Sequence, residues 1–335
     1  MFNHKINIMK KNLSLLTLIC IISAIALLNG CKKATVPTLT TTEVTEITAN
    51  SAVSGGEITA DGGDDIIDKG VCWNTTVEPT ISDSKTSNGK GSGIFTSNIS
   101  GLQSGKTYSV RAYATNSAGT AYGEEYSFNT KLADVDGNQY AIVKIGSQMW
   151  MAENLKTTKY NDNTPIPNVT GDAEWAALTT GGYCWYNNDE AYFKPLYGAL
   201  YNWFAIETGK LCPEGWHVPS DAEYNALEVS LGLPQADVDV LGWRGTNQGA
   251  QMKSTTGWNA GENGTNTSGF TALPGGYRFY GAGTFYQQNA LGYWWSATQN
   301  STLAAWYRRL DGNNEGVYKG NVEKQAGKSV RCVKD

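Results

Sequence analysis

The chain has 335 residues, of which 40% are hydrophobic, 17% charged and 11% aromatic, and its formal net charge at pH 7 is −5. This length is sufficient for more than one folded domain. The first 30 residues carry three lysines and no acidic residue, so their removal changes the net charge to −8. Because binding to phosphates requires a basic surface, this acidic balance argues against nucleic acid as a partner.

The N-terminus has the pattern of a targeting signal. Three lysines precede an apolar run over residues 13–28, and Gly30-Cys31 follows. This pattern is typical of a bacterial lipoprotein signal peptide over residues 1–30, with cleavage before Cys31 and an acyl lipid on its sulfur. The alternative is a membrane-spanning helix, which needs roughly 20 apolar residues. We expect a short lipidated tether over 31–37 and attachment to the outer membrane, at the cell surface or, alternatively, at its periplasmic face.

Residues 38–130 contain short alternating runs separated by Gly- and Asn-rich turns, and these runs read SAVSGGEIT, IDKGVCWN, GIFTSNIS, TYSVRAYATN and YGEEYSFNT. Such spacing without a helical pattern predicts an all-β sandwich. Leu102 and Tyr108 resemble the tyrosine-corner region of fibronectin type III domains. Cys72 is expected to be a buried, small hydrophobic residue. We interpret the sandwich as a spacer, with a second binding face as the alternative, and residues 131–133 as a linker.

One helix is signalled clearly in the second half of the chain. Ser220 and Glu223 have the spacing of a capping box, in which each side chain bonds to a free backbone N–H. The apolar stripe over Tyr224–Leu231 follows at helical spacing, and Gly232 can end the helix with a positive φ.

One cysteine precedes this helix in the sequence and another follows it. Cys212 lies just before the helix, and Cys332 is the only cysteine close to the C-terminus. We predict that they form a disulfide, which would close a loop of roughly 120 residues and stabilise the fold by about 4–5 kcal/mol. Cys184 is left over, as a buried free thiol or as an alternative partner.

The remaining pattern predicts few helices and many short strands. YAIVKIG and QMWMAENL form an opening strand pair, Asp172 can cap a helix over 174–178, and a further helix is expected over 196–206. The closing strands are expected around 294–298, 305–310 and 327–332, with the last one paired to the Cys212 region.

Five motifs resemble the Fibrobacter succinogenes major paralogous domain (FISUMP) family. They are VDGNQYAIVKIGSQMWMAENLK, CPEGWHVPSDAEYNAL, GFTALPGGYR, YWWSAT and SVRCV, and they extend over about 134–335. The resemblance implies a compact, Trp-rich extracytoplasmic domain with an α+β C-type-lectin-like fold, and it implies no particular activity. The expected fold class is therefore multidomain, with a fibronectin-III/Ig-like sandwich followed by this domain over 134–335.

The sequence offers little for catalysis. After the signal peptide His217 is the only histidine, and its position beside a capped helix favours a structural role. One histidine and scattered cysteines do not make a zinc site. We predict no enzyme activity, no catalytic residues and no metal site, with a carboxylate pair for glycoside hydrolysis as the alternative.

Calcium is also unsupported, because the sugar-binding triplets of C-type lectins are absent from this chain. Oxygen-bearing side chains remain within residues 311–315, which we interpret as a polar hairpin turn; they are Asp311, Asn313, Asn314 and Glu315.

Two loops, over 242–269 and 276–286, are rich in aromatic, amide and glycine residues. The candidate binding residues there are Trp243, Arg244, Trp258, Tyr277, Arg278, Tyr280 and Tyr286. Such side chains suit stacking on sugars or docking of a protein, and the alternative is that they are core residues. We predict a non-catalytic protein for glycan or surface adhesion, or alternatively an accessory lipoprotein of an outer-membrane complex with a β-barrel partner.

Overall fold

The computed structural model describes residues 33–335, and the predicted signal peptide and Cys31 lie outside the described residues. The chain forms two compact units. The first contains the described residues up to Thr45, Val53–Ile99 and Ser109–Ser127, and the second contains Glu46–Ala52, Ser100–Tyr108 and Phe128–Asp335. Within residues 33–335, none of the helices is both long enough and apolar enough to cross a membrane.

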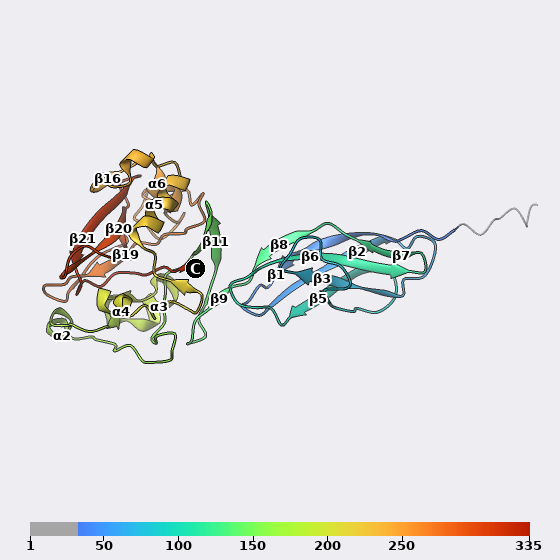
Figure 1. The fold of residues 1–335 in the computed structure, drawn as a ribbon, viewed down its shortest axis with the longest axis horizontal. Coiled ribbons are helices and arrows are strands. Elements are labelled where there is room, and N and C mark those ends of the chain that lie inside the picture. The colour runs from blue at the N-terminus through green and yellow to red at the C-terminus, as the bar shows by residue number, and fades with distance from the viewer. Residues whose placement is uncertain (1–32) are drawn as a thin grey trace, which may run out of the picture. The chain divides into compact units, whose positions relative to one another are not determined.

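The N-terminal strands form a two-sheet sandwich (Figure 1). One sheet has the order β1-β2-β5, and the other has the order β4-β3-β6-β7, with β8 also paired to β6. The strands are β1 Thr38–Thr45, β2 Ser51–Ala60, β3 Asp68–Asn74, β4 Ser84–Lys85, β5 Gly93–Ser100, β6 Thr107–Asn116, β7 Gly119–Tyr122 and β8 Tyr126–Asn129. This arrangement of a three-stranded and a five-stranded sheet confirms the Ig/fibronectin-III-like sandwich that the alternating runs predicted.

Details of the sandwich also agree with the sequence. The backbone N–H of Gln103 donates to the hydroxyl of Tyr108 over 3.1 Å, which is the hydrogen bond of a tyrosine corner. Cys72 is a buried free thiol. Burial raises the pKa of this thiol to about 11, so it remains neutral and behaves as a small apolar side chain.

The second unit combines short helices with many strands. Its first half contains β9 Leu132–Ala133, β10 Gln139–Tyr140, β11 Ile142–Ile145, β12 Gln148–Met151, α2 Asp172–Ala176, β13 Tyr183–Cys184, η1 Tyr186–Asn188, α3 Glu190–Tyr197, β14 Leu200–Tyr201, α4 Trp203–Glu207 and β15 Trp216–His217. Its second half contains α5 Asp221–Ser230, η2 Gln235–Asp237, β16 Gly242–Arg244, α6 Gln248–Met252, β17 Gly275–Arg278, β18 Phe285–Gln288, β19 Leu291–Gln299, β20 Ala304–Asp311, β21 Val317–Glu323 and β22 Val333–Lys334.

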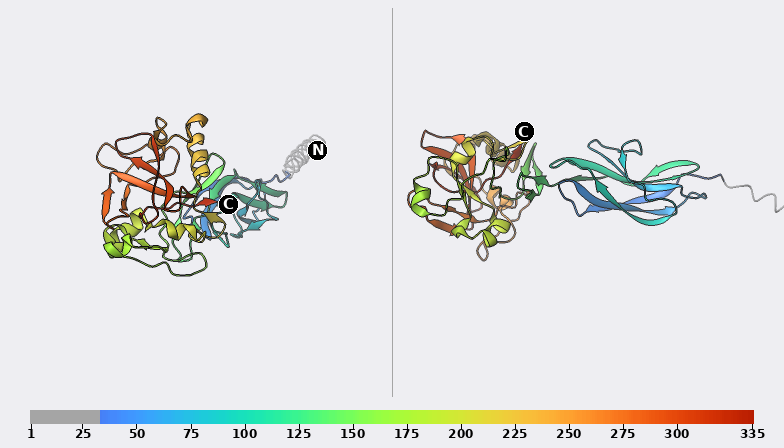
Figure 2. Two further views of the ribbon diagram at one scale, coloured as in Figure 1. Left: turned by 60° about the vertical axis from the view of Figure 1, so that its left-hand side comes forward. Right: turned by 90° about the horizontal axis from the view of Figure 1, so that it is seen from below.

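The largest sheet of this unit has six strands in the order β16-β21-β20-β19-β17-β18. Only β17 and β19 run parallel within it, and the other neighbours are antiparallel. In Figure 1, α5 and α6 lie above this region, α2, α3 and α4 lie below it, and β19 to β21 extend beside both groups. Figure 2 shows the same strands from two further directions.

The six-stranded sheet contributes to two hydrophobic clusters because successive side chains of a strand point to opposite faces. Trp294 and Leu310 pack with Tyr224 and Leu227 of α5. Trp295 points the other way, into the larger cluster that contains the aromatic residues of α3 and α4. The sheet is therefore inserted between two cores.

The central helix forms as predicted. The side chain of Ser220 accepts from the backbone of Glu223, and the Glu223 carboxylate accepts from the backbone of Ser220, which completes the capping box of α5. Tyr224 and Leu227 are fully buried. Gly232 follows the helix with a φ of 98°, which a side chain would strain.

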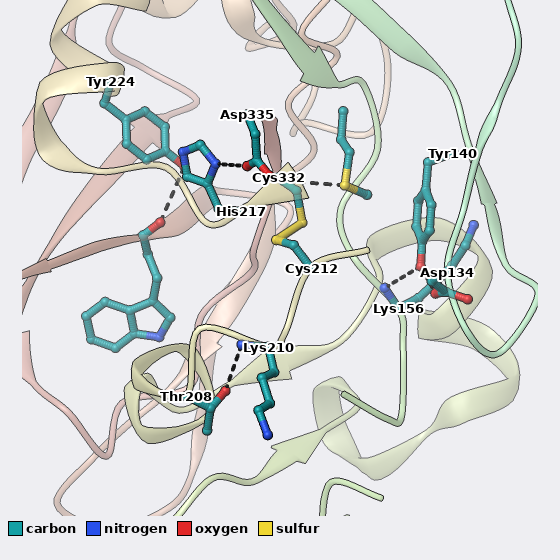
Figure 3. Close-up of a disulfide and its surroundings, with 12 residues drawn as sticks. Asp134, Tyr140, Lys156, Thr208, Lys210, Cys212, His217, Tyr224, Cys332 and Asp335 are labelled. Carbon is teal, nitrogen blue, oxygen red and sulfur yellow. Dashed lines mark hydrogen bonds and ion pairs between the residues drawn. A yellow bond between two sulfur atoms is a disulfide. The ribbon is translucent and has the colours of Figure 1, made fainter. Parts of the chain in front are cut away.

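The disulfide between Cys212 and Cys332 is present, with 6.0 Å between the two Cα atoms and 120 residues between the two positions (Figure 3). It lies beside the pairing of β15 with β22, which confirms that the end of the chain pairs with the Cys212 region. Cys184 is a buried free thiol, so the first of its two alternatives is correct.

Three local predictions need correction. The helix expected over 196–206 is wrong, because Gly198 adopts a φ of 72° and ends α3, and the buried Asn202 side chain starts α4 by accepting from the backbone of Ala205. Helix α2 exists, but Asp172 lies in its first turn and provides no cap. Residues 132–133, expected to belong to a linker, form β9 and pair with β10.

Candidate binding face

One side of the six-stranded sheet carries a row of aromatic side chains. The register pairs Trp243 with Tyr318, Tyr318 with Arg309, and Arg309 with Tyr293, so these side chains share one side of the sheet. Tyr307 and Tyr277 lie on the same side through their own pairings. We call this surface the aromatic face, and its members are Trp243, Tyr277, Tyr286, Tyr293, Tyr307, Arg309 and Tyr318.

The rings of the aromatic face form a continuous series. From Trp243 through Tyr318, Tyr307, Tyr293 and Tyr277 to Tyr286, neighbouring ring centroids lie 4.9 to 6.2 Å apart. These distances are typical of interacting aromatic pairs. The two ends of the row come from β16 and β18, so the row crosses all six strands.

Exposure varies along the row. Tyr286 is 44% exposed and Tyr293 is 7% exposed, while Trp243, Tyr307 and Tyr318 are half-buried. Tyr307 packs partly against the larger hydrophobic cluster, which covers the sheet where Trp295 lies. The aromatic face is therefore covered next to Trp295 and exposed to solvent at Tyr286.

Gly320 makes room for this arrangement. A Cβ atom at Gly320 would lie 2.8 Å from the Cε1 atom of Tyr318 and 2.9 Å from the hydroxyl of Tyr307. A side chain at this position would displace both rings, so the missing side chain of β21 allows the two rings to stack.

Two cations belong to the same side of the sheet. The Arg309 guanidinium lies 4.5 Å from the ring centre of Tyr318 and 4.9 Å from that of Trp243. Lys328 comes from the segment after β21, and its Nζ atom lies 4.1 and 4.2 Å from the ring centres of Tyr293 and Tyr307. Both contacts have cation–π geometry.

Burial shifts the pKa of Lys328 and of three tyrosines of the aromatic face. Burial, followed by the neighbouring Arg309, lowers the pKa of Lys328 well below its usual value. Burial raises the pKa of Tyr307 to about 12, and it also raises the pKa of Tyr277 and Tyr293. The phenol groups are thus protonated at neutral pH and can both donate and accept hydrogen bonds.

The opposite side of the sheet is built around buried ion pairs. The Glu228 carboxylate lies 2.6 Å from Nε of Arg308 and 2.5 Å from a terminal nitrogen of Arg244. Asp221 pairs with Arg308 and with Lys319, each over 2.7 Å. These contacts fix α5 against β16, β20 and β21.

The structure divides the predicted binding residues into two groups. Trp243, Tyr277 and Tyr286 lie on the aromatic face, and Tyr280 is partly buried against the larger cluster. Arg244, Trp258 and Arg278 are buried, so the prediction that the loops expose these three side chains needs correction.

The buried members of the loops hold backbone segments together. Arg278 donates from Nε to the carbonyl of Gly283 and from a terminal nitrogen to the carbonyl of Val169, both over 2.6 Å. Its guanidinium also lies 4.5 Å from the ring centre of Trp175. Trp258 donates from its ring nitrogen to the carbonyl of Ala272. These side chains position loops and do not present them to a ligand.

The sequence analysis missed five residues of this region: Tyr293, Tyr307, Arg309, Tyr318 and Lys328. The signal for four of them is the two-residue period of the closing strands, which places Tyr307 with Arg309 and Tyr318 with Gly320 on one side. For Lys328 no local pattern exists, because its position depends on the isolated bridges of residues 327–329.

The polar hairpin at 311–314 surrounds a cation of the protein itself. Nζ of Lys253 donates to the carbonyls of Asp311, Gly312 and Asn314 over 2.8 to 3.3 Å. This agrees with its interpretation as a turn. Within residues 33–335, no group of three or more His, Cys, Asp or Glu side chains has an arrangement suited to a metal ion.

His217 contacts Asp335 at the end of the chain (Figure 3) and Glu223 of the α5 capping box. Its ring nitrogens lie 2.5 Å from a carboxylate oxygen of Asp335 and 2.8 Å from one of Glu223. Partial burial alone would lower its pKa, but the hydrogen bonds to these two carboxylates outweigh burial and raise it. The geometry is that of a structural histidine.

Fold and face together define a two-domain, mainly β protein with an Ig/fibronectin-III-like sandwich and a second, disulfide-closed domain. The chain belongs to the Fibrobacter succinogenes major domain family, whose model matches residues 143–334, more than half of the chain. This match confirms the family predicted from the five motifs. Comparison with curated proteins gave no match.

Solved structures with some likeness include titin domains A168–A170, at 20% identity over 29% of this chain and with a TM-score of 0.23. This chain spans 33% of that titin fragment. The sensor domain of the anti-sigma factor RsgI4 of Pseudobacteroides cellulosolvens is 16% identical over 29% of this chain and 97% of its own, with a TM-score of 0.23. The fold assignment rests on the strand order and not on these likenesses.

Proposed function

We propose that this protein is a non-catalytic, lipid-anchored outer-membrane binding protein, and that its second unit is a C-type-lectin-like α+β domain that binds glycans through the aromatic face. The observation that carries the proposal is the row of six rings across the six-stranded sheet. Five of the six rings are at least partly exposed, and aromatic side chains that gather on a surface are typical of binding sites.

The chemistry of the row suits sugars. A sugar ring has C–H groups on its flat sides and hydroxyl groups around its edge, so it can stack on an aromatic ring while its edge bonds to polar groups. Tyr277, Tyr293 and Tyr307 offer both parts, because burial raises the pKa of their hydroxyls and keeps them protonated. Successive rings from Trp243 to Tyr286 can serve successive sugar units of one chain.

The other ionisable groups support binding over catalysis. Glu228 and Asp221 are engaged in ion pairs with arginine and lysine side chains. His217 is engaged by two carboxylates at the helix cap. A general base or nucleophile must be free to contact a substrate, whereas these groups form their hydrogen bonds with other side chains of the protein.

The proposal includes a lipid anchor on Cys31. The lysine-flanked apolar run before Cys31 supports a lipid attachment. Several acyl chains on one cysteine would hold the protein stably at a membrane. The sandwich would then act as a spacer between the lipid and the glycan-binding domain, at the cell surface.

The test is a glycan array probed with the detergent-solubilised full-length chain. We expect Trp243→Ala and Tyr318→Ala each to weaken binding of the best glycan at least about tenfold, as truncation of a central interface aromatic does. Tyr192→Ala is the matched control, since Tyr192 is an exposed tyrosine of α3 that is not part of the aromatic face. Thermal unfolding of each variant checks that the fold is retained.

Two results would contradict the proposal. Glycan binding that is unchanged in both face variants would remove the aromatic face from the site. A chain that binds no glycan but copurifies stoichiometrically with a β-barrel protein would instead be an accessory subunit of an outer-membrane complex.

A further inference from the structure

The aromatic face has two basic side chains, Arg309 and Lys328, and only one of them is in an ion pair within residues 33–335. Arg309 has a single ionic partner, Asp311, with 3.2 Å between a guanidinium nitrogen and a carboxylate oxygen. Its Nε atom is buried and forms no hydrogen bond within residues 33–335. The side chain is 22% exposed, so part of the guanidinium meets solvent.

Lys328 adds a second cation behind the first. Its side chain is buried, and its Nζ atom is surrounded by the rings of four aromatic residues, at 4.1 to 5.4 Å from their centres; they are Tyr277, Tyr293, Trp295 and Tyr307. This amine forms neither a hydrogen bond nor an ion pair with any residue of the part that the structure describes. Burial, followed by the neighbouring Arg309, lowers the pKa of this amine, and an anion that approaches it would favour its charged form.

The inward side of the same sheet is different. There the three cations Arg244, Arg308 and Lys319 meet the carboxylates of Glu228 and Asp221, with Asp239 3.7 Å from Lys319. Three positive groups thus have three negative partners on that side. On the aromatic face, two basic side chains, Arg309 and Lys328, have only the carboxylate of Asp311 as an ionic partner within residues 33–335, and it pairs with Arg309.

The single carboxylate is also a weak partner. Burial raises the pKa of Asp311, and the neighbouring Glu262 raises it further, while Arg309 and Lys253 act in the opposite direction with a smaller total effect. An anion from outside would give Arg309 a second partner and would favour the charged form of Lys328.

We propose that the aromatic face selects glycans with carboxylate-bearing sugars of the uronic-acid class, and that Arg309 binds the carboxylate. This inference rests on the proposed glycan function and narrows it to a ligand class. The guanidinium lies against the rings of both Trp243 and Tyr318, so a sugar stacked beside either ring brings a ring carboxylate within its reach. Arginine suits this role because its planar fork matches a carboxylate. A carboxylate held by Arg309 would also favour the charged form of Lys328, which lies behind the row.

The experiment compares one acidic oligosaccharide with its neutral analogue of the same shape. The probes are a tetramer of galacturonic acid and the same tetramer as its methyl ester, titrated calorimetrically into the detergent-solubilised full-length chain. We expect the acid to bind at least about tenfold more tightly than the ester, as for one charge-assisted hydrogen-bond pair. Raising the salt concentration should weaken binding of the acid and leave that of the ester almost unchanged.

Variants test whether Arg309 is responsible for the preference for the acid. Arg309→Gln should reduce the affinity for the acid to that for the ester and leave the affinity for the ester within a factor of about two. Arg111→Gln is the matched control, because Arg111 is also stacked on a tyrosine, 4.2 Å from the ring centre of Tyr122, but lies in the sandwich. Lys328→Met should lower the preference for the acid without removing it.

The outcomes separate the two proposals. Equal affinity for the acid and the ester in the wild-type chain overturns the selectivity and leaves glycan binding intact, and this result depends on no variant. A preference for the acid that survives in Arg309→Gln overturns the role of Arg309. Binding of neither probe, with neutral glycans retained on the array through Trp243 and Tyr318, also overturns the selectivity alone. Failure of every glycan overturns both proposals.

Discussion

Glu228→Ala should strongly destabilise the second unit. Glu228 is 1% exposed and its carboxylate contacts two guanidinium groups. After truncation Arg308 keeps Asp221 at 2.7 Å. Arg244 loses its only carboxylate, however, and keeps a hydrogen bond to Asn225 and one to a backbone carbonyl. Breaking one side of a buried ion pair costs about 3–5 kcal/mol, and the orphaned Arg244 places this variant in that range.

Urea unfolding followed by tryptophan fluorescence measures the effect. Ten of the eleven tryptophans lie beyond Lys131, so the signal reports mainly on the second unit. With a slope of about 2–3 kcal/mol per molar urea, the midpoint should fall by about 1–2 M. Glu228→Gln keeps the volume and one acceptor for Arg308, and it should cost less, about 1–3 kcal/mol.

The control is Glu190→Ala, which removes an exposed carboxylate that pairs with Lys194 over 2.8 Å on the surface of α3. Such a pair contributes about 0.3–0.5 kcal/mol. If Glu228→Ala lowers the midpoint no more than Glu190→Ala does, then the buried charges do not fasten α5 to the sheet, and the account of the inward side is wrong.

Three further predictions concern the ends and loops of the second unit. Reduction of the Cys212–Cys332 disulfide should lower the free energy of unfolding by about 4–5 kcal/mol, and an unchanged urea midpoint in reductant would contradict this. The raised pKa of His217 implies that the stability advantage of wild type over His217→Gln is greatest below a pH of about 6.5 and is lost as the pH rises through the folded-state pKa. Unfolding temperatures of both proteins measured over this pH range test the prediction, and a difference that grows with pH would refute it. Lys253→Met should speed amide hydrogen exchange at residues 311–314, because three carbonyls lose their donor, and unchanged exchange would show that the turn holds itself.

Where local chemistry determines the structure, the sequence was sufficient. The capping box of Ser220 and Glu223, the tyrosine corner at Tyr108 and the two-residue period of the sandwich strands depend on near neighbours. The helix expected over 196–206 failed because Gly198 breaks the backbone and the side chain of Asn202 makes tertiary contacts, donating to the carbonyl of Thr180 and accepting from the backbone of Gly182. Periodicity alone does not contain that information.

The candidate site was only partly predictable for a related reason. Trp243, Tyr277 and Tyr286 stand out because they lie in loops and short strands with few aliphatic residues. Tyr307 and Tyr318 lie in strands whose two sides are both rich in large side chains, so the alternation cannot show which side is open. That choice is made by the register of all six strands, and a single sequence does not reveal this register.

The motifs by which the sequence resembles its family are mostly scaffold. Arg278 of GFTALPGGYR and Arg331 of SVRCV are fully buried and donate to backbone carbonyls of distant loops. These bonds need arginine at those positions whatever the domain binds, because five donors in a fixed fork can hold several carbonyls at once. The side chains that face outward from β20 and β21, Arg309 and Tyr318, belong to none of the five motifs. We expect ligand choice to depend on them.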